Sequence, residues 1–500
     1  MGSQDLTWLV GELRALAGDL HAGEGETPLV VAIDQGGHAS RAIAFDLTGT
    51  AIAESYCAIS TFRSGKDRVE HDAHEVTQSI RTALTDLQQA LGSAVDRVVA
   101  AGLATQRSSI ACWDQRTHQP LSPILSWQDR RHATFVERLR PHEADIRART
   151  GLVLSPHYGA SKLRWCLDNV DAVRDAAKHK RLAAGPLSAW LLRSLLIERP
   201  HLVDAVNAAR TQLLDLHTHA WSSELTTLFG VPQTVLPSVV ANRHAFGHIA
   251  FGARRIPVTV CTGDQAAMPF ALGRPDAQTI YLNIGTGAFL QRSAEQAEAP
   301  QGLLAGLMFT SERDGVMQVA HSIEGTVNGA GSAIDWLSER AGIDTHRAAH
   351  AMTREQAATL TPPIFVNGVS GVGSPYWRSQ LDSRFSGEGG ATARLIAVLE
   401  SIAFLICANI ERMREGVQRV RISGGLSSSD YLCECIATLS GLTIERLTLP
   451  ESTATGLAFL VAGEPADWRP NPELERFVGV TDNELSRRYE QWRRLMDEAA

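Results

Sequence analysis

Two stretches of the chain, about half its length apart, share one pattern of residues. One reads VVAIDQGGHASRAIAFD from Val30 to Asp46, and the other reads TIYLNIGTGAFLQRS from Thr279 to Ser293. Each consists of an apolar strand, a glycine-rich turn and a second apolar strand. A pattern repeated at this separation predicts two similar α/β halves. Ligands of such folds bind where strand ends and helix N-termini converge, which predicts a cleft between the halves.

The length of the chain also predicts two domains, because it has 500 residues and a single core rarely grows beyond about 250. A composition of 44% hydrophobic and 20% charged residues is typical of a soluble globular protein. The formal net charge of −8 argues against nucleic acid or an anionic membrane as a general partner. An anionic ligand must therefore be bound by local donors, such as backbone N–H groups or a few arginines.

The cysteines indicate a reducing compartment. There are seven, scattered along the chain, and the one close pair, Cys433 and Cys435, lacks CxxC spacing. This predicts free thiols and no structural zinc, and two core positions of a helix explain the pair better than a redox role. We therefore expect a cytoplasmic protein without membrane insertion, since no apolar run is long enough to span a bilayer.

Residues 1–27 precede the first predicted strand as a separate extension. Apolar residues recur there at helical spacing and predict an amphipathic helix: Leu6, Leu9, Val10, Leu13, Leu16 and Leu20. The run is interrupted by charges and has no basic start, so it does not resemble a signal peptide. Packing on the body of the protein and docking of a partner both stay open as roles for this helix.

Strands and helices alternate beyond the first hairpin. A helix is predicted near His74 to Leu91, followed by a buried strand from Arg97 to Ala104. Helices dominate from about Ala133 to Leu214, and strands return near Ile256. RVRISGGLSSSDYL, which starts at Arg419, reads as a strand that runs into a double glycine and a serine-rich helix start.

The glycine-rich turns are candidates for phosphate binding. A tight turn between strands exposes consecutive backbone N–H groups, which can cradle phosphate oxygens. Asp34 stands at a strand end beside the first turn, where a carboxylate suits a cation that bridges phosphates. A single hairpin of this kind is more often only a turn. The sequence contains no GxxxxGK[ST] P-loop and no well-placed GxGxxG, so a nucleotide must be held in another way.

A second aspartate stands at the end of another predicted strand. In TGDQAAMPF, Asp264 follows a buried strand and a glycine and opens an apolar, helix-like run. The commonest role for such an aspartate is an N-cap. The alternative is a general base that takes a proton from an attacking hydroxyl, and Gly263 and Gln265 fit the close approach of a substrate. Local spacing leaves both roles open.

Eleven short motifs follow one another in order along nearly the whole chain. They are IDQGxxxSRAIAFD, GLATQR, SWQDRR, TGLVLSP with SKLRW, NAARTQLLDLHTHAW, GDQAA, IGTGAF, EGTVNGAGSAIDWL, GVGSPYW, ISGG and ESTATGLAFL. Together, from about Leu29 to the YEQW near the C-terminus, they resemble the FGGY carbohydrate kinases. DQG and WQDRR are similar to the glycerol kinase branch of that family rather than to xylulokinases.

The resemblance implies an α/β, two-domain actin-like ATPase fold of the actin/hexokinase type, with ribonuclease H-like halves and an active-site cleft between the domains. The N-terminal domain would span 28–272 and the C-terminal domain 273–500. The resemblance also implies ATP and Mg²⁺ as cofactors and transfer of a phosphoryl group to a primary hydroxyl of a sugar or polyol. Such transfer depends mostly on positioning and charge neutralisation.

Roles for individual positions follow from the same resemblance. Asp264 would be the catalytic base, with Arg107 beside it, and Asp34 and Asp264 would lie near the metal. The acceptor would contact a set of residues in the first half and one in the second: Arg107, Ser108, Trp127, His157, Asp264, Gln265 and Phe289. The nucleotide and its phosphates would contact the two turns and positions near them: Gly36, Gly37, His38, Arg41, Gly285, Thr286, Gly331, Asp335, Gly425 and Ser429.

The first turn departs from the family pattern, which reads Asp-x-Gly-Thr-Thr-Ser. Gly37, His38 and Ala39 replace the hydroxyl-bearing residues, whereas Ser40 and Arg41 are kept. Backbone donors survive this change, but each lost hydroxyl contact is worth about 0.5–1.5 kcal/mol, so we expect slower transfer. His38 either donates an imidazole N–H to the phosphates or is a solvent-facing turn residue.

The acceptor and nucleotide positions also depart from the glycerol kinase pattern. Glycerol kinases carry Arg-Glu where this chain has Arg107-Ser108, and usually tyrosine where it has His157. Losing a carboxylate and a phenol that pair with hydroxyls predicts a different or larger acceptor, such as a ketose or a longer polyol. Asp335 replaces a usual glutamine and Ser429 a usual asparagine, and both keep the ability to hydrogen-bond.

Two function classes remain. One is an active polyol or sugar kinase whose partner is a small molecule, and the other is a catalytically weak or inactive ATP-binding relative with a regulatory role. The joint presence of Asp34, Arg107, Asp264 and Gln265 favours the active kinase. The pair His71 and His74 is similar to a structural segment of the family rather than to a metal site. Whether the chain forms a homo-oligomer stays open.

Overall fold

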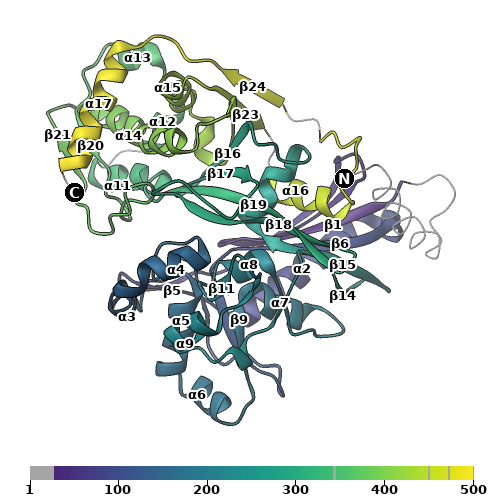
Figure 1. Cartoon of the computed structure of the whole chain (residues 1–500). Coiled ribbons are helices and arrows are strands. Elements are labelled where there is room, and N and C mark those ends of the chain that lie inside the picture. Colours follow the sequence, from purple (N-terminus) through teal and green to yellow (C-terminus); the bar gives the residue numbers. More distant parts are fainter. Residues whose placement is uncertain (1–26, 342–344, 449–450, 471–472, 499–500) are drawn as a thin grey trace. The chain divides into compact units, whose positions relative to one another are not determined.

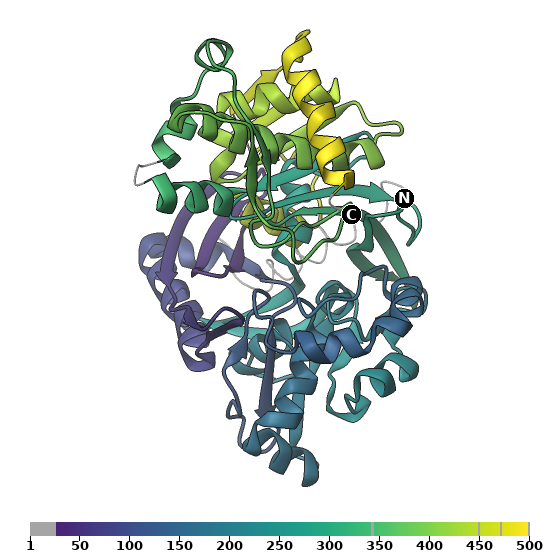
Figure 2. The same cartoon turned by 90° about the vertical axis from the view of Figure 1, so that its left-hand side faces the viewer.

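The computed structural model describes residues 27–341, 345–448, 451–470 and 473–498 (Figures 1 and 2). The chain forms two compact units, each assembled from separate segments. Unit 1 comprises Met1–Pro275, Gly306–His321 and Glu451–Asn471, and unit 2 comprises Asp276–Ala305, Ser322–Pro450 and Pro472–Ala500. The helix predicted in the N-terminal extension lies outside the described residues, and the boundary predicted between residues 272 and 273 stays a prediction.

The central sheet of unit 1 has six strands in the order β14-β15-β6-β1-β2-β3. Three neighbouring strands run parallel: β1 (Leu29–Gln35), β6 (Val98–Thr105) and β15 (Arg254–Gly263). The others pair antiparallel with their neighbours: β2 (Ala39–Asp46), β3 (Ala51–Ala58) and β14 (Arg243–Phe251). Every residue of β1 and β6 is buried, which explains why both read as nearly continuous apolar runs.

Each face of this sheet is covered by a helix. α16 (Ser452–Val461) lies so close to β6 that a Cβ added at Gly102 would come within 2.5 Å of Val461 Cγ2. α2 (Ala73–Leu91) packs on β2, where Ser79 Oγ and Ser40 Oγ hydrogen-bond at 2.7 Å. The helix predicted from His74 to Leu91 is therefore confirmed.

Strand alternation decides which side chains point to which helix. Ile43 and Phe45 of β2 belong to the apolar core around α16. Because side chains alternate along a strand, Arg41 points to the α16 face and Ser40 to the α2 face. Ser40 is fully buried against α2, and its hydroxyl has a structural partner there, whereas His38 in the turn before it is exposed.

The rest of unit 1 is built around a five-stranded sheet and a group of helices. The sheet order is β4 (Phe62–Ser64), β5 (Arg68–His71), β8 (Ile124–Leu125), β7 (Ile110–Asp114) and β9 (Leu182–Pro186). The α-helices are α3 (Ala133–Arg138), α4 (Glu143–Thr150), α5 (Gly159–Asn169), α6 (Asp171–Lys178), α7 (Leu187–Leu195), α8 (Ala205–Ala209), α9 (Ser223–Phe229) and α10 (Asp264–Ala267). This confirms the helical character predicted for the region after Ala133.

Short elements complete unit 1. The 3₁₀ helices are η1 (Gly92–Arg97), η2 (Arg140–His142), η3 (Gln233–Val235) and η4 (Met268–Leu272). Two small sheets pair β10 (Leu202–Asp204) with β13 (Ser238–Val240) and β11 (Leu214–Asp215) with β12 (Ala220–Trp221).

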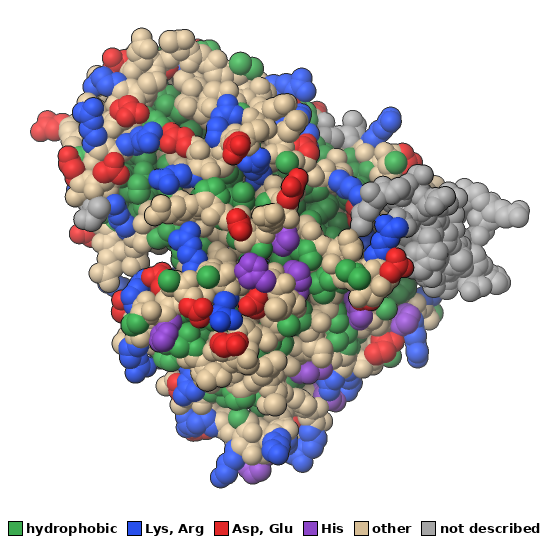
Figure 3. All heavy atoms as spheres, in the orientation of Figure 1, with side chains coloured by type: hydrophobic (Ala, Val, Ile, Leu, Met, Phe, Trp, Pro, Cys, Tyr) green, Lys and Arg blue, Asp and Glu red, His purple; other side chains and the backbone are tan. Residues whose placement is uncertain are grey.

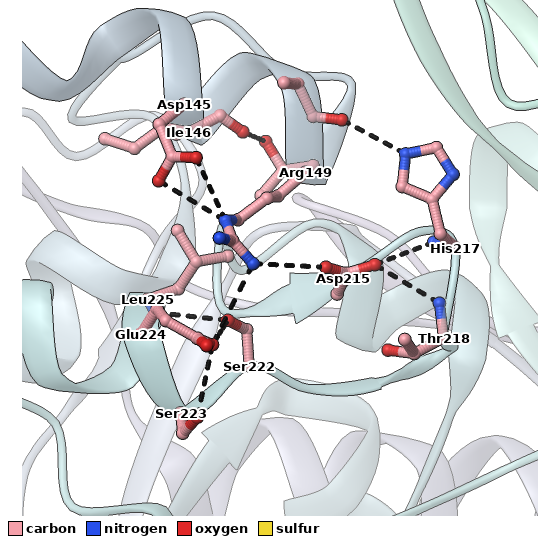
Figure 4. Close-up of polar contacts among 12 residues, drawn as sticks. Asp145, Ile146, Arg149, Asp215, His217, Thr218, Ser222, Ser223, Glu224 and Leu225 are labelled. Carbon is pink, nitrogen blue, oxygen red and sulfur yellow. Dashed lines mark hydrogen bonds and ion pairs between the residues drawn. The ribbon is translucent and has the colours of Figure 1, made fainter.

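A polar cluster joins three of these elements (Figure 4). Arg149 of α4 pairs with Asp145 at 3.1 Å, and its Nη1 lies 3.7 Å from Asp215 and 3.9 Å from Glu224. Asp215 also accepts a hydrogen bond from the backbone N–H of His217 at 2.9 Å, which closes the β11–β12 turn. The DLHTHAW segment of the sequence therefore has a structural role here.

Unit 2 repeats the strand topology of unit 1. β16 (Thr279–Ile284) pairs antiparallel with β17 (Ala288–Ala294) and parallel with β22 (Arg419–Ser423). β22 in turn pairs parallel with β23 (Thr443–Thr448), and β23 pairs antiparallel with β24 (Glu473–Phe477). The order β17-β16-β22-β23-β24 thus corresponds to β2-β1-β6-β15-β14, which confirms the prediction of two similar α/β halves.

Two further strands belong to the same seven-stranded sheet, in the order β18 (Leu304–Arg313), β19 (Val316–Val327), β17. A separate two-stranded sheet pairs β20 (Ile364–Val366) with β21 (Arg384–Ser386). The helices of this part of the chain are α11 (Gly331–Ala341), α12 (Thr345–Ala351), α13 (Arg354–Ala358), α14 (Ala391–Arg412), η5 (Gly425–Ser428), α15 (Asp430–Ser440) and α17 (Asn483–Glu498). α14 is long and apolar enough to cross a membrane, but 83% of its apolar window is buried in the protein, as in a core helix. Cys433 and Cys435 are buried free thiols in α15, as predicted.

The surface carries charges of both signs. On the face shown in Figure 3, lysine and arginine side chains are interspersed with aspartate and glutamate. The described residues of that face form no extended basic patch.

Candidate active site

Three predicted site residues lie at the carboxyl ends of three neighbouring parallel strands of unit 1. Asp34 is near the end of β1, Arg107 follows the end of β6, and Asp264 follows the end of β15. The strand register places Gln35 and Gly263 opposite Thr105, the last residue of β6. The carboxyl edge of a parallel sheet is where ligands of α/β folds bind, so the topology alone brings these three residues together.

Asp34, which is buried, and Asp264, which is partly buried, are neighbouring carboxyl groups whose charges interact. Burial and the neighbouring charge of Asp264 raise the pKa of Asp34 to about 7, although Arg41 opposes the shift. Burial also raises the pKa of Asp264, against the charge of Arg107. Asp34 Oδ1 is buried and has no hydrogen-bond partner in the described chain. Two such carboxylates can be charged together at neutral pH only if a cation compensates them.

The backbone around Asp264 excludes the N-cap alternative. α10 begins at Asp264 itself, with Gly263 at the N-cap position and no side-chain cap. The Asp264 carboxylate instead accepts hydrogen bonds from the N–H of Gln265, at 2.7 Å, and from the backbone of Arg107. A Cβ at Gly263 would lie 2.5 Å from Arg107 Cγ and Cδ, so this glycine makes room for the arginine.

Arg41 connects the first hairpin to α16. It stands opposite Asp34 in the register of β1 and β2 and pairs with Glu451 at 2.9 Å. Its guanidinium also lies 5.3 Å from the ring centroid of Tyr56. Contact of Arg41 with a phosphate stays a prediction. A phosphate at this position would compete with the Glu451 carboxylate for the Arg41 guanidinium.

Ser108 is held in an unusual conformation. It is buried and has a φ of 64°, in the left-handed region that side chains other than glycine rarely adopt. Its hydroxyl has no hydrogen-bond partner within the described residues, while its carbonyl accepts from Lys162 Nζ at 2.9 Å. Strained backbone of this kind concentrates at functional sites.

His157 lies next to Ser108 and Trp127. Lys162 donates to the His157 carbonyl at 2.6 Å as well as to Ser108, and the His157 and Trp127 rings are 5.7 Å apart. Arg130 Nη1 is 3.2 Å from His157 Nδ1, so Nδ1 is the acceptor. Burial, followed by the charge of Arg130, holds the pKa of His157 well below its usual value. The ring is therefore neutral and carries its proton on Nε2.

Lys162 and Arg130 are site residues to which sequence reasoning assigned no role. Both lie inside quoted motifs, SKLRW and WQDRR. Burial is the main cause that lowers the pKa of Lys162 well below its usual value. A lysine inside a helix that is otherwise apolar on the same side was the signal that could have identified it, because a buried lysine needs specific partners.

Unpaired polar atoms coincide with the predicted acceptor and metal positions. Asp34 Oδ1, Ser108 Oγ and Gln265 Oε1 are all buried without a hydrogen-bond partner in the described part of the chain. Native proteins pair the large majority of buried polar atoms, so these three atoms are candidates to pair with a ligand, although further unpaired buried atoms occur elsewhere in the described chain.

The first turn presents free backbone donors. Gly36 N–H closes the turn on Ala39 O at 2.9 Å, and the N–H groups of Gly37 and His38 donate to no other described residue. His38 is exposed, and a Cβ added at Gly37 would have no heavy atom within 4 Å. This is the open, N–H-lined turn that phosphate oxygens require.

The second turn, in unit 2, uses its carbonyls to seat a helix. Gly285 and Thr286 are exposed, and their carbonyl oxygens accept the N–H groups of Gly331 and Ser332 at 3.0 Å each. A Cβ at Gly331 would lie 2.7 Å from Gly285 O, so α11 can approach the turn only with glycine at its start.

The remaining predicted positions of unit 2 are distributed over four elements. Asp335 is exposed on α11 and hydrogen-bonds to His346 at 2.6 Å. Ser429 caps α15 and donates its hydroxyl to Ala349 O at 2.9 Å, so that hydroxyl already has a structural partner. Gly425 is exposed at the start of η5, and Phe289 is partly buried on β17. Their contacts with nucleotide or acceptor stay predictions.

The donor set fits a magnesium ion better than a closed metal cage. Among the described residues no group of three or more histidine, cysteine or acidic side chains could hold a metal. Mg²⁺ is usually bound by one or two carboxylates together with substrate phosphates and water, which matches the pair Asp34 and Asp264. His71 and Asp72 are structural, because His71 Nδ1 bonds Ser60 O and Asp72 caps α2.

The fold and this edge of the sheet define a class of phosphotransferases with duplicated α/β halves. Residues 29–271 match the N-terminal domain of the FGGY family of carbohydrate kinases, and residues 280–463 match its C-terminal domain. The chain belongs to the FGGY family of carbohydrate kinases. It is therefore an enzyme that transfers phosphate from ATP to an alcohol group, with the two-domain, actin-like fold predicted from the sequence.

Individual relatives lie in the glycerol kinase branch. The chain is 33% identical to the glycerol kinase of Trichlorobacter lovleyi over 89% of its own length and 92% of that protein. It is 32% identical to the glycerol kinase of a Synechocystis species over 86% and 90%, respectively. The solved structure of Plasmodium falciparum glycerol kinase with ADP superposes with a TM-score of 0.83 at 21% identity, covering 95% of this chain and 98% of that one.

Proposed function

We propose that the protein transfers the γ-phosphate of Mg²⁺-ATP to a primary hydroxyl of a longer polyol or a ketose, with Asp264 as the general base. The observation that carries this proposal is the pair of neighbouring carboxyl groups of Asp34, which is buried, and Asp264, which is partly buried, next to Arg107 at the carboxyl edge of three parallel strands. The pKa values of both carboxyl groups are raised.

Asp264 is suited to accept a proton. Its pKa is raised by burial, which makes the carboxylate a better base, and the N–H groups of Gln265 and Arg107 fix its orientation. Arg107 keeps the carboxylate ionised until an acceptor hydroxyl arrives. When bound, Mg²⁺ neutralises phosphate charge, and Asp34 with Asp264 would hold it.

The acceptor preference rests on Ser108 and His157. The free hydroxyl of Ser108 and the Nε2–H of neutral His157 are two polar groups available to an acceptor. A serine is smaller than the glutamate of glycerol kinases, so the acceptor has more room at this position. We infer that a chain longer than glycerol fills this room and pairs with both groups, with Trp127 as an apolar wall.

The nucleotide positions of both turns complete the proposal. Gly37 and His38 offer backbone N–H groups to the phosphates, and in unit 2 Gly285, Thr286 and Gly425 are exposed and free of bulky side chains that would block a nucleotide. We place the protein in the cytoplasm, where ATP is supplied and where its seven free cysteines stay reduced.

An ADP-release assay with Mg²⁺-ATP tests the proposal across glycerol, four- to six-carbon polyols and ketoses. We expect the highest kcat/KM with one of the longer acceptors, and Asp264→Asn should lower it by about 10²–10⁴-fold. Turnover no higher than that of Asp264→Asn with every acceptor would contradict a kinase. Efficient phosphorylation of glycerol would contradict the acceptor preference, and Ser108→Glu, which restores a carboxylate, should shift the preference toward glycerol.

A further inference from the structure

A cavity in unit 1 gathers positive charge away from the residues assigned above. It has a volume of about 530 Å³ and is lined by segments of α2, the turn before β8, and α7 with the residues that follow it. Arg81, Arg193 and Arg199 line it, with Glu75 as the one carboxylate of the lining. We call it the arginine pocket. Three arginines against one glutamate are unusual in a chain whose net charge is −8.

No carboxylate neutralises these arginines. Within the described residues Arg81, Arg193 and Arg199 form no salt bridge, whereas Arg41, Arg131 and Arg181 each pair with a carboxylate. Glu75 is bonded elsewhere, because its Oε1 accepts the backbone N–H of Ser60 at 2.9 Å. With three arginines and one glutamate, the lining keeps a formal excess of positive charge.

Neutral acceptors hold two of the three guanidinium groups, those of Arg81 and Arg193, in place instead. Arg81 Nη2 donates to Ser194 O at 2.8 Å, and Arg193 donates to the carbonyls of Gln115 and Arg199. Arg193 Nη2 also donates to His118 Nδ1 at 2.9 Å. Carbonyl and imidazole acceptors orient a guanidinium without cancelling its charge. The Arg81 and Arg193 guanidinium groups are thus oriented in advance with their charge intact, which favours anion binding.

The charges are also crowded and partly desolvated. Burial, followed by the charge of Arg199, lowers the pKa of Arg193, and burial with both arginines lowers the pKa of His118. Arg193 Nε is buried without a hydrogen-bond partner in the described chain. Like charges held together without a counter-ion are destabilising, so the fold keeps an arrangement that an anion would relieve.

Backbone strain is found at the same place. His118 has a φ of 60° and Arg199 a φ of 51°, and both are residues of the pocket lining. Left-handed backbone costs such residues roughly 1 kcal/mol each, and it tends to persist where a site requires it. The carbonyl oxygen of Arg199, which has this conformation, accepts a hydrogen bond from the Arg193 guanidinium.

We propose that the arginine pocket binds the phosphate group of a small phosphorylated molecule. Planar guanidinium groups recognise phosphate oxygens in pairs, and a volume of this size accommodates a ligand larger than phosphate alone. The indole of Trp190 lines the pocket and gives the non-phosphate part an apolar surface. This site is additional to the acceptor and nucleotide positions, and its existence does not depend on the proposed acceptor.

Calorimetric titration of the full chain with inorganic phosphate, glucose 6-phosphate and glucose tests this site, with sodium chloride at matched ionic strength as the background. Glucose 6-phosphate should bind more tightly than phosphate, and glucose should not bind at the pocket. Equal binding of both phosphates would identify inorganic phosphate as the ligand. Heats no larger than those of added sodium chloride would overturn the proposal.

Variants localise the binding. Arg199→Gln is the cleanest, since no hydrogen bond from its side chain is found in the described chain, and it should weaken phosphate binding about tenfold or more without lowering the unfolding temperature. Arg193→Gln should weaken phosphate binding more than Arg199→Gln does, and Arg193→Lys should weaken it less than Arg193→Gln. Arg255→Gln, which removes an exposed arginine of β15, is the matched control and should change nothing. Wild-type affinity in both Arg199→Gln and Arg193→Gln would place the anion elsewhere and overturn the assignment.

Discussion

The two glycine-rich hairpins have the same strand topology, but they differ in the charge of the residue at the strand end and in the hydrogen bonds of the turn. Two residues before its first glycine, the hairpin of unit 1 has Asp34 and the hairpin of unit 2 has Asn283. In unit 1 the carboxylate is buried beside a second one, and the turn keeps free N–H groups. In unit 2 the residue is a neutral amide, and the carbonyls of the turn bind the first turn of α11.

This difference shows that duplicating a fold does not duplicate its site. The order of the hydrogen-bonded strands fixes where each turn lies. One side chain at the strand end decides whether the turn has a charged group beside it. The unit 1 hairpin has the features of a cation and phosphate site, and the unit 2 hairpin has those of a scaffold that positions a helix. Substitutions made in pairs, one in each hairpin, test this contrast.

The largest expected effect is on turnover, when the strand-end residues Asp34 and Asn283 are each replaced. Asp34→Asn should lower kcat by about 100-fold or more, because it removes a charge that compensates the cation and phosphates. Asn283→Ala, its counterpart, should lower kcat by less than about tenfold. Steady-state ADP release at saturating ATP measures both, and equal losses in the two variants would remove the chemical contrast between the hairpins.

The same carboxylate should make stability depend on pH. The pKa of Asp34 is about 7 in the folded protein against an ordinary value of 3.8, so the folded state holds a proton that the unfolded state releases between these values. Its contribution to stability is therefore complete below pH 3.8 and is lost as pH rises through 7, by at most about 4 kcal/mol.

Asp34→Asn should abolish this dependence. The free energy of unfolding of the variant should exceed that of the wild type by little at pH 5 and by most at pH 8, as measured by thermal or urea unfolding. Added Mg²⁺-ADP should raise the stability of the wild type at pH 8, and it should not raise that of the variant. A difference between the two proteins that is independent of pH would mean that Asp34 is ionised normally in the fold.

A second pair of variants compares the packing of the two turns. Gly331→Ala should destabilise the protein by about 1–3 kcal/mol, because the new Cβ would lie 2.7 Å from a backbone carbonyl that cannot move freely. Gly37→Ala should be neutral or stabilise by up to about 1 kcal/mol, since the position is open and its φ is not left-handed. Urea unfolding at pH 6 measures both, and equal costs would mean that the first turn is also closely packed.

The smallest expected effect concerns the hydroxyls that the first turn lacks. The double variant Gly37→Thr with His38→Thr should raise kcat/KM for ATP by about 2- to 10-fold per useful hydroxyl contact. The corresponding change in the second hairpin, Thr286→Ala, removes an exposed hydroxyl and should lower the same constant by a similar factor. No change in either variant would show that backbone N–H groups alone bind the phosphates.

Much of this organisation could be read from the sequence. The two apolar hairpins predicted two similar halves, and Asp34 and Asp264 were each predicted at the end of an apolar strand. These inferences hold because strand periodicity and strand ends are local properties. The helix α2 and the buried cysteines of α15 were predicted from local periodicity in the same way.

Other features depended on contacts between distant parts of the chain. Arg41 meets Glu451, Lys162 joins Ser108 to His157, and the arginine pocket combines three separate segments. Sequence reasoning placed Ser40 and Arg41 side by side as kept positions, but alternation along β2 sends Ser40 to α2 and Arg41 to α16. The sequence determined the strands, their ends and the family, because these depend on neighbours along the chain. Tertiary structure decided which faces meet, which charges are paired and which polar atoms stay free, because burial and long-range packing set those energies.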